Sequence, residues 1–476
     1  MRAETVQMQS TSPSVAAVAR RRRVAILVEN DIIYRHFVQN RAFGEMARRM
    51  DVTFVFAKPG AGNKRLTVHL DPNQIGAPME LLPIEPQRIY LWRRLFQVSQ
   101  LVWRPGENWK HLRKTMRYLI GRNATILSTA LALPGIYQVY RAITYRRINA
   151  LPSQMESVLQ RLKPDVIIHP TVFDGYFIND VVLIGRRLGI PTIAIMNSWD
   201  NPATKRSVVG QPDWVLVWGA QTQAHAARYM GMKPERAVPF GAAQFEIYGS
   251  QPRVTRTEFC RAHGIDPAKR ILLYAGSSKG SDEFEHLRTI ETAIDDGTLE
   301  NTAVVYRPHP WGDGGYKGER LLGHPWRHVA IENSMRTYLE GVRAGRKDRY
   351  LADYADTHDV LSSVDALVSP LSTILLEGAL HGKPVLCFMP SEREGSSFHL
   401  QKRLVHFEDL YKSPLVLMAH GDDTLVPKLV ELMGRAGDGD LQEKSRELCE
   451  HFVASFAKPF SVRIADFVEQ LTDDSA

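Results

Sequence analysis

The sequence is poor in cysteine and contains no long apolar run, and each shortage excludes a class of protein. Its three cysteines, Cys260, Cys387 and Cys449, are odd in number and far apart, so neither a disulfide scaffold nor a zinc site is expected. No stretch reaches the roughly 20 apolar residues of a membrane-spanning helix. The first residues lack the apolar core of a secretion signal, and we expect no signal peptide there. These absences favour a protein of the reducing cytoplasm.

The charge of the chain is modest in sum and uneven in distribution. Of 476 residues, 44% are apolar, enough for two or three folded domains, and the formal net charge is +8. Residues 1–23 contain five basic residues and one acidic, and residues 85–150 contain twelve basic and two acidic. The rest of the chain therefore carries a net charge of −6. This predicts a mildly acidic body with two basic patches.

Short β-branched runs alternate with helical patterns along most of the chain, as in parallel βαβ units. The first half predicts strands at Val24–Glu29, Asp51–Ala57, Asp165–His169, Thr192–Met196 and Trp214–Trp218. The second half predicts strands at Ile271–Ala275, Ala303–Tyr306, Asp365–Val368 and Pro384–Phe388. Such apolar strands need helices on both faces, which indicates an α/β fold of two facing Rossmann-like doubly wound domains. We place the domains at 24–245 and 246–476, after a disordered basic tail at 1–23.

Residues 85–150 break this alternation and predict a basic helical insertion in the first domain. Their twelve basic residues are accompanied by nine aromatic ones, three of them tryptophans. Helices at Tyr90–Val102 and Asn108–Ile120 would display Lys and Arg beside Trp, Tyr and Leu, as helices at a membrane surface do. The alternative is an insertion that packs on its own domain or binds another anionic partner. Nucleic acid is not expected, because no recognition motif accompanies the charge.

Ligands of doubly wound sheets bind beyond the carboxyl ends of the strands, so the residues that follow each strand are candidate site residues. Strand Ala303–Tyr306 leads into Arg307, Pro308, His309 and Pro310. The two prolines hold His309 in an extended turn. Guanidinium and imidazole groups both donate hydrogen bonds to phosphate or carboxylate, which favours an anion site over a simple tight turn.

A second strand end carries hydroxyl groups. Strand Asp365–Val368 is followed by Ser372 and Thr373 and then by a helix at 374–381. Hydroxyls at a helix N-terminus, beside free backbone N–H groups, are suited to phosphate. Glu377, one turn further, is placed to reach ribose hydroxyls, unless it faces solvent or caps the helix.

A third strand end is made of small residues. Gly276, Ser277 and Ser278 follow strand Ile271–Ala275, and small residues let a diphosphate approach the backbone. The Walker spacing is absent, so a P-loop is not predicted. Together the three strand ends indicate a nucleotide phosphate ligand in the second domain.

The segments VYRPHP and SPLSTILLEGALHGKPV resemble the His-Pro and Ser/Thr motifs of bacterial GT-B-type transferases that build surface polymers. That group includes polysialyltransferases, capsule Kdo transferases and CDP-glycerol glycerophosphotransferases. The resemblance covers chiefly residues 270–390 and implies that His309, Ser372 and Thr373 hold a CMP- or CDP-linked donor. It also implies that the first domain binds the acceptor, because NSWDNPATKRSVVGQPDWVLVWG is similar to the acceptor domain of related surface-carbohydrate proteins.

Inverting transfer needs a carboxylate or imidazole that removes the proton of the acceptor hydroxyl. The first domain offers four acids after its strands: Asp174, Glu29, Asp31 and Asp200. We rank Asp174 first, because Gly175 beside it lets substrate approach and Phe173-Asp174-Gly175 keeps half of the acidic-acidic-Gly motif of similar sialyltransferases. In the structural alternatives, Glu29 and Asp31 cap the helix that follows them, and Asp200 holds its own loop in place by hydrogen bonds.

No Asp-x-Asp metal motif stands at a strand end, so the sequence predicts transfer without a metal or other cofactor, with Arg307 and His309 meeting the leaving-group charge. The predicted activity is a glycosyltransferase that moves a sugar from a nucleotide-sugar donor to a lipid-linked glycan or cell-surface polysaccharide. Its predicted location is peripheral, on the inner face of the plasma membrane, through residues 85–150. A CDP-glycerol-type polyol-phosphate transferase, a UDP-sugar epimerase and an inactive assembly subunit remain alternatives.

Overall fold

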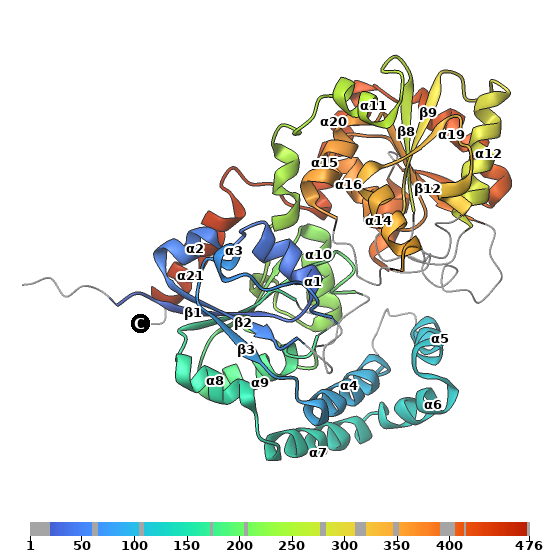
Figure 1. The fold of residues 1–476 in the computed structure, drawn as a ribbon. Coiled ribbons are helices and arrows are strands. Elements are labelled where there is room, and N and C mark those ends of the chain that lie inside the picture. Colours follow the sequence, from blue (N-terminus) through green and yellow to red (C-terminus); the bar gives the residue numbers. More distant parts are fainter. Residues whose placement is uncertain are drawn as a thin grey trace, which may run out of the picture.

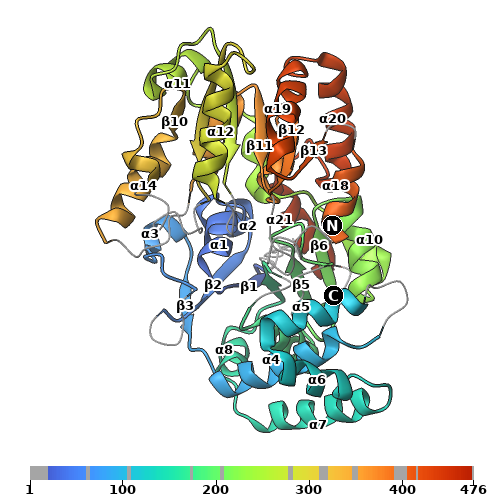
Figure 2. The same cartoon turned by 90° about the vertical axis from the view of Figure 1, so that its right-hand side faces the viewer.

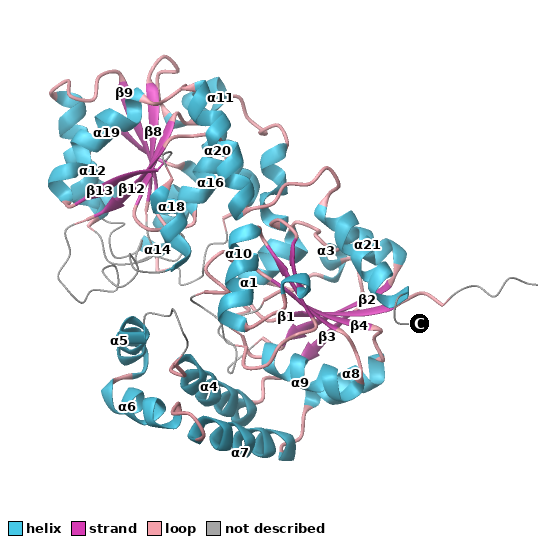
Figure 3. Cartoon of the chain, turned by 180° about the vertical axis from the view of Figure 1, so that it is seen from behind, coloured by secondary structure: helices cyan, strands magenta, loops and turns pink. Residues whose placement is uncertain are grey.

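Two parallel sheets form the centre of the computed structural model, which describes residues 20–59, 65–103, 109–171, 175–203, 208–276, 282–309, 320–345, 352–390, 405–413 and 416–473 (Figure 1). The first sheet has seven strands in the order β3-β2-β1-β4-β5-β6-β7, and the second has six in the order β10-β9-β8-β11-β12-β13. Every strand pairing in both sheets is parallel. Helices cover both faces of each sheet (Figure 3). The predicted architecture of two doubly wound domains is confirmed.

The strands of the first sheet are β1 (Arg23–Val28), β2 (Asp51–Ala57), β3 (Met79–Leu82), β4 (Val166–His169), β5 (Thr192–Ile195), β6 (Trp214–Val217) and β7 (Ala237–Pro239). Those of the second are β8 (Arg270–Ala275), β9 (Thr302–Arg307), β10 (Val329–Ile331), β11 (Ala366–Ser369), β12 (Val385–Met389) and β13 (Val416–His420). All nine predicted strands are present, with ends that differ by at most one residue. The other four, β3, β7, β10 and β13, are the edges of the two sheets.

The α-helices that precede residue 250 are α1 (Asp31–Ile33), α2 (Gly44–Arg49), α3 (Pro72–Ile75), α4 (Pro86–Gln100), α5 (Trp109–Ile120), α6 (Arg122–Leu131), α7 (Ile136–Ala150), α8 (Gln154–Leu162), α9 (Ile178–Leu188) and α10 (Ala220–His225). Those that follow are α11 (Arg256–His263), α12 (Glu283–Asp295), α14 (Asn333–Arg343), α15 (Tyr354–Ser363), α16 (Ile374–Leu380), α18 (Glu408–Lys412), α19 (Leu425–Gly434), α20 (Gly439–Phe452) and α21 (Phe460–Asp473). Short 3-10 or π-helical segments lie at Tyr34–Gln39, Ala226–Met230, Pro234–Arg236, Ala243–Gly249, Val405–Phe407 and Asp422–Thr424.

Strand β1 shows how the sequence builds a sheet that is buried on both faces. Val24, Ile26 and Val28 belong to one apolar cluster, together with side chains of α2, of the π-helical segment Tyr34–Gln39 and of α21. Ala25 and Leu27 point to the opposite face and belong to another, with α8 and α9. Because successive side chains of a strand alternate between faces, an unbroken apolar run is needed to bury both.

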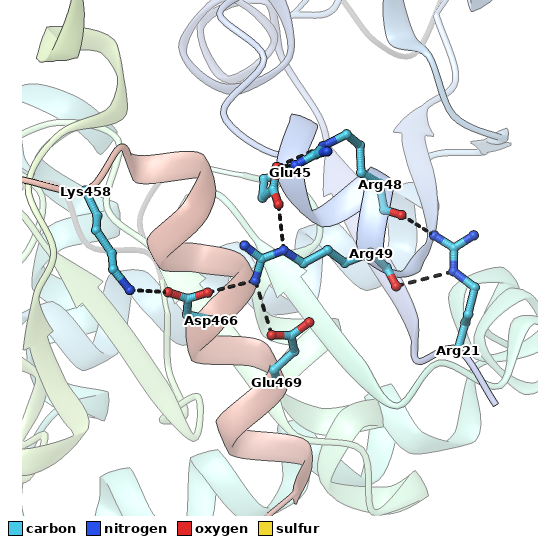
Figure 4. A network of polar contacts seen from close by, with 7 residues as sticks. All are labelled: Arg21, Glu45, Arg48, Arg49, Lys458, Asp466 and Glu469. Atoms are coloured by element: carbon cyan, nitrogen blue, oxygen red, sulfur yellow. Dashed lines mark hydrogen bonds and ion pairs between the residues drawn. The ribbon is translucent and has the colours of Figure 1, made fainter. Parts of the chain in front are cut away.

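The last helix, α21, returns to the first sheet after the second domain is complete. Its Phe460, Ile464 and Val468 are fully buried in the cluster of β1 and β2. Figure 4 shows the polar contacts beside this packing, in which Arg49 on α2 donates to Asp466 at 2.8 Å and to Glu469 at 3.2 Å. These partly exposed ion pairs add little, so the buried side chains anchor the helix. The division at residue 246 therefore groups α21 with the second domain by sequence, whereas its packing completes the first.

The basic residues before β1 are held on the body of the protein. Arg20 binds Asp165, and Arg21 donates to the Arg48 carbonyl at 2.6 Å. Arg23 is the first residue of β1. The expected tail is thus shorter than 1–23, and residues 1–19 lie outside the described part.

The described part of residues 85–150 forms the helices α4 to α7, with α7 outermost at the lower end of Figures 1 and 2. Helix α4 was expected to display Trp92 at a surface. Trp92 is instead only 3% exposed and donates to Asp180 of α9 at 2.8 Å. Among the helices in the described part of the chain, none is both long and apolar enough to cross a membrane.

Candidate functional site

The candidate site is a cavity of about 580 Å³ between the two domains. The strand order reverses between β1 and β4 in the first sheet and between β8 and β11 in the second. Residues that follow these strands line the cavity, among them Asn30, Thr171, Gly276 and Ser372. The crevice beyond the carboxyl ends at such a reversal is where doubly wound sheets bind ligands.

Arg307, the last residue of β9, is the central cation of the second-domain wall. The residue lines the cavity although it is only 7% exposed, and its Nη2 donates to Thr357 Oγ1 at 2.9 Å. Nη1 is buried, and no acceptor among the described residues lies within bonding distance of it. An anion in the cavity would satisfy this donor, because a buried guanidinium favours paired oxyanions. His309 lines the same wall, and Pro310 lies outside the described residues.

The start of α16 brings three predicted residues into the cavity wall: Ser372, Thr373 and Glu377. Thr373 is the N-cap of α16, yet its side chain makes no capping hydrogen bond. The Glu377 carboxylate accepts a hydrogen bond from the Tyr248 hydroxyl. Burial raises the pKa of Glu377 above its ordinary value, and the Tyr248 bond and the charges of Arg307 and Arg35 partly offset this. Glu377 thus lines the cavity with its carboxylate bonded to Tyr248, and a contact with ribose requires a place in this wall.

Gly276 after β8 is required by close packing. A Cβ atom at this position would lie 2.5 Å from Glu283 Oε2. The Glu283 carboxylate is held there by the Tyr306 hydroxyl. Ser277 and Ser278, the predicted phosphate donors of this strand end, lie outside the described residues.

Two of the four candidate acids hold the fold of the first domain. Glu29 is fully buried and accepts from the backbone N–H groups of Tyr176 at 2.5 Å and Phe177 at 3.0 Å, just before α9. Asp31 accepts from the Thr67 backbone at 2.7 Å and from the Thr67 hydroxyl at 2.6 Å. These bonds favour a structural role for both, with Glu29 serving α9 and not the helix that follows it in sequence.

Asp200 is placed differently from those two acids. It lines the cavity from the first domain and accepts from the Asn201 side chain at 3.1 Å. Asp174, the candidate ranked first, lies outside the described residues. Among the described acids, Asp31, Asp200 and Glu377 line the cavity. Asp31 and Asp200 belong to the first domain, and the Asp31 carboxylate is bonded to Thr67.

Sequence reasoning missed a polar contact that joins the two domains at this cavity. Arg35 donates to the Ala352 carbonyl at 3.0 Å and to the Tyr354 hydroxyl at 2.9 Å, and that hydroxyl lies 2.7 Å from His36 Nε2. Burial and the Arg35 charge hold the pKa of His36 well below 6.5. Arg35 and His36 lie on the π-helical segment Tyr34–Gln39, and such segments recur at functional sites. We call the set Arg35, His36 and Tyr354 the interdomain clasp.

A second missed feature connects the cavity with the basic insertion. The guanidinium groups of Arg65 and Arg93 lie over the Tyr176 ring, 5.3 Å and 5.8 Å from its centroid. Arg65 lines the cavity, whereas Arg93 belongs to α4. Cationic side chains therefore continue from the cavity onto the insertion.

No family model matches the chain, and no curated protein matches it in sequence. Solved structures resemble it in fold. The S. aureus MnaA–UDP structure aligns with a TM-score of 0.54 at 12% identity, over 95% of this chain and 97% of that one. UDP-GlcNAc 2-epimerase from Neisseria meningitidis, bound to UDP-GlcNAc, aligns with 0.51 at 11% identity, over 94% and 100%. CalG4, the calicheamicin glycosyltransferase, aligns with 0.50 at 15% identity, over 95% and 98%. The chain therefore has the two-domain GT-B fold.

Proposed function

We propose that the protein is a glycosyltransferase that moves a sugar from a nucleotide-sugar donor to a lipid-linked glycan or cell-surface polysaccharide. The observation that carries this proposal is the buried Arg307, which lines the interdomain cavity and whose Nη1 has no acceptor among the described residues. A buried guanidinium left in this way costs free energy unless an anion pairs with it. The phosphate of a nucleotide donor supplies that anion.

The second domain holds the donor in this proposal. Arg307 and His309 bind its phosphates, together with the hydroxyls of Ser372 and Thr373. Glu377 accepts from a ribose hydroxyl, next to the bond that it already receives from Tyr248. Gly276, Ser277, Ser278 and Pro310 complete the donor site as the sequence predicts. The resemblance to CMP- and CDP-dependent transferases favours a cytidine nucleotide.

In this proposal the first domain binds the acceptor and supplies the catalytic base. An acceptor hydroxyl attacks the anomeric carbon, the bond from that carbon to the donor phosphate oxygen breaks, and a carboxylate takes the hydroxyl proton. Asp200 lines the cavity and is the base favoured among the described acids, while Asp174 remains the candidate of the sequence motif. Arg307 and its neighbours stabilise the negative charge of the departing nucleotide, so the proposed reaction needs no metal. Because the acceptor displaces the nucleotide in a single step, the configuration at the anomeric carbon is inverted.

The membrane contact is part of the same proposal. A lipid-linked acceptor reaches the cavity only if the protein works at a lipid surface, and residues 85–150 carry a twelve-to-two excess of base over acid. The cationic side chains of Arg93 and Arg65 lead from that insertion to the cavity. We propose a peripheral location on the inner face of the plasma membrane.

A UDP-sugar epimerase is the second candidate, because a 2-epimerase shares the fold at a TM-score above that of CalG4. An epimerase needs no acceptor and gains nothing from a basic insertion. A polyol-phosphate transferase would transfer through phosphorus, and an inactive subunit would bind without turnover.

Two measurements test the proposal. Thermal unfolding with CMP, CDP, UDP and GDP identifies the donor base, because a ligand of the folded state raises the melting temperature. Mass spectrometry then follows sugars linked to that base, with and without a lipid-linked glycan acceptor. A glycosylated acceptor is expected. A C2-epimerised sugar formed without acceptor would establish the epimerase, a transferred polyol phosphate would establish the polyol-phosphate enzyme, and no nucleotide effect at all would refute donor binding.

A further inference from the structure

The exposed apolar side chains of the described residues are concentrated in one segment. Among the described residues, twelve large apolar side chains are exposed, and nine of them belong to residues 85–150. Single exposed apolar residues are normal on a protein surface, whereas a group of them marks a surface that contacts something else.

Six of the nine lie on α6, α7 and the turn between them. They are Ile126, Leu127, Leu133, Ile136, Val139 and Ile143, each between 46% and 60% exposed, and we call them the α6–α7 ridge. On α7 the residues Ile136, Val139 and Ile143 are spaced three and four apart, so they share one face of the helix. Thr144 and Ile148, on the other face, are 4% and 0% exposed. The helix therefore buries one face in the insertion and leaves an aliphatic one uncovered.

The charged residues of the segment that carries the ridge are all of one sign. Residues 109–150 contain eight Lys or Arg and no Asp or Glu. Arg122 on α6 and Arg141, Arg146 and Arg147 on α7 are exposed. A second copy of this chain would bring two such basic surfaces together, which is unfavourable. Aliphatic side chains with a basic border instead match a bilayer that carries anionic headgroups.

We propose that the α6–α7 ridge is the membrane-contact surface of the protein, inserting between the headgroups of a bilayer that contains anionic lipid. The ridge lies on α6 and α7, whereas α4 packs its Trp92 and Arg88 against Asp180 of the first domain. This inference rests on the proposed function, whose membrane contact it locates, but its test uses no substrate.

The test is co-sedimentation of the full chain with vesicles of phosphatidylcholine, with or without phosphatidylglycerol. Binding is expected only with the anionic lipid. Val139→Ser with Ile143→Ser should lower the partition coefficient at least about tenfold, since both the apolar and the charged contact are needed for stable binding. Leu81→Ser with Val430→Ser removes aliphatic residues that are 47% and 44% exposed elsewhere, and this matched control should bind like the wild type.

A charge variant and a label separate the remaining outcomes. Arg141→Gln with Arg146→Gln and Arg147→Gln should also reduce binding to anionic vesicles. The native cysteines are all buried, so a polarity-sensitive dye on Ile136→Cys reports the ridge selectively. Its emission should shift to the blue when anionic vesicles are added, whereas a dye on Val430→Cys should not respond.

Three outcomes would each overturn the inference. They are failure of the wild-type protein to bind anionic vesicles, binding of the ridge variant to them as strong as that of the wild type, and no shift in the emission of the dye on Ile136→Cys. Thermal shifts with soluble nucleotides, measured on the same variants, keep the two proposals apart. Normal nucleotide binding with lost vesicle binding supports the ridge, whereas vesicle binding without any nucleotide effect refutes the donor site and leaves the ridge intact.

Discussion

Gly175 lies against the Glu29 carboxylate, so closely that a Cβ atom at position 175 would be 1.6 Å from Glu29 Oε1. Both residues therefore help to pack the end of β1 against the start of α9. Gly175 was singled out in sequence because a glycine admits substrate. The structure gives it a second reason to be glycine, which is room for a buried carboxylate.

Gly175→Ala is expected to destabilise the protein by about 1–3 kcal/mol, because overpacking displaces the carboxylate from the two N–H groups that it accepts from. Urea unfolding measures this. Gly434→Ala, in helix α19 with nothing within 4 Å of the added carbon, is the control and should leave stability the same or slightly higher. Equal stability of Gly175→Ala and the wild type would contradict the packing described here.

Arg307→Gln is expected to weaken binding of the donor nucleotide about tenfold to a hundredfold, the range of a charge-assisted hydrogen bond. The loss would appear as a smaller nucleotide-dependent rise in melting temperature, measured against the variant without ligand. Arg270→Gln is a suitable control, since Arg270 starts β8 at the opposite end of the sheet and donates to the Met433 carbonyl at 3.0 Å. Unchanged affinity in Arg307→Gln would remove the main support for the donor site.

The interdomain clasp predicts a loss of stability in acid. Burial and Arg35 hold the pKa of His36 well below 6.5, so the unfolded chain takes up a proton there at a higher pH than the folded protein does. The stabilisation from neutral His36 is therefore complete above about pH 6.5 and is lost as the pH falls below it. Protonation would also remove the acceptor that Nε2 offers to the Tyr354 hydroxyl.

The free energy of unfolding of the wild type should fall more steeply between about pH 7 and pH 5 than that of His36→Gln, which has no proton to gain at this position. Chemical unfolding at several pH values gives the two slopes. His420→Gln, at an exposed position on β13, should keep the wild-type slope. If His36→Gln keeps it as well, the clasp does not titrate as described.

The sequence predicted the central strands and missed the edges for a physical reason. Strands β1 and β12 are buried on both faces, so they read as unbroken apolar runs. Edge strands such as β3 (MELL) and β7 (AVP) are short and partly exposed, and their composition hardly differs from that of loops.

The candidate site was predictable where it follows from strand ends. Arg307, Ser372 and Glu377 were found in this way, and they line one cavity. The clasp was not predictable, because Arg35 and Tyr354 are 319 residues apart and meet only when the domains face each other. A count of basic residues in the sequence also overstates the positive charge at the surface. Arg88 was counted in the basic patch, although it is 2% exposed.

Arg88 in fact holds the insertion to the first domain. Its guanidinium donates to Asp180 Oδ2 at 3.1 Å and to the Ile148 carbonyl at 2.8 Å, so it joins α4, α9 and α7. Asp180→Asn would leave a buried cation without its counter-charge and is expected to cost about 3 kcal/mol or more in urea unfolding. Glu80→Gln removes the partner of the exposed Arg161 and should change little, because solvent already screens that pair. Similar losses in the two variants would mean that the buried pair does not anchor the insertion.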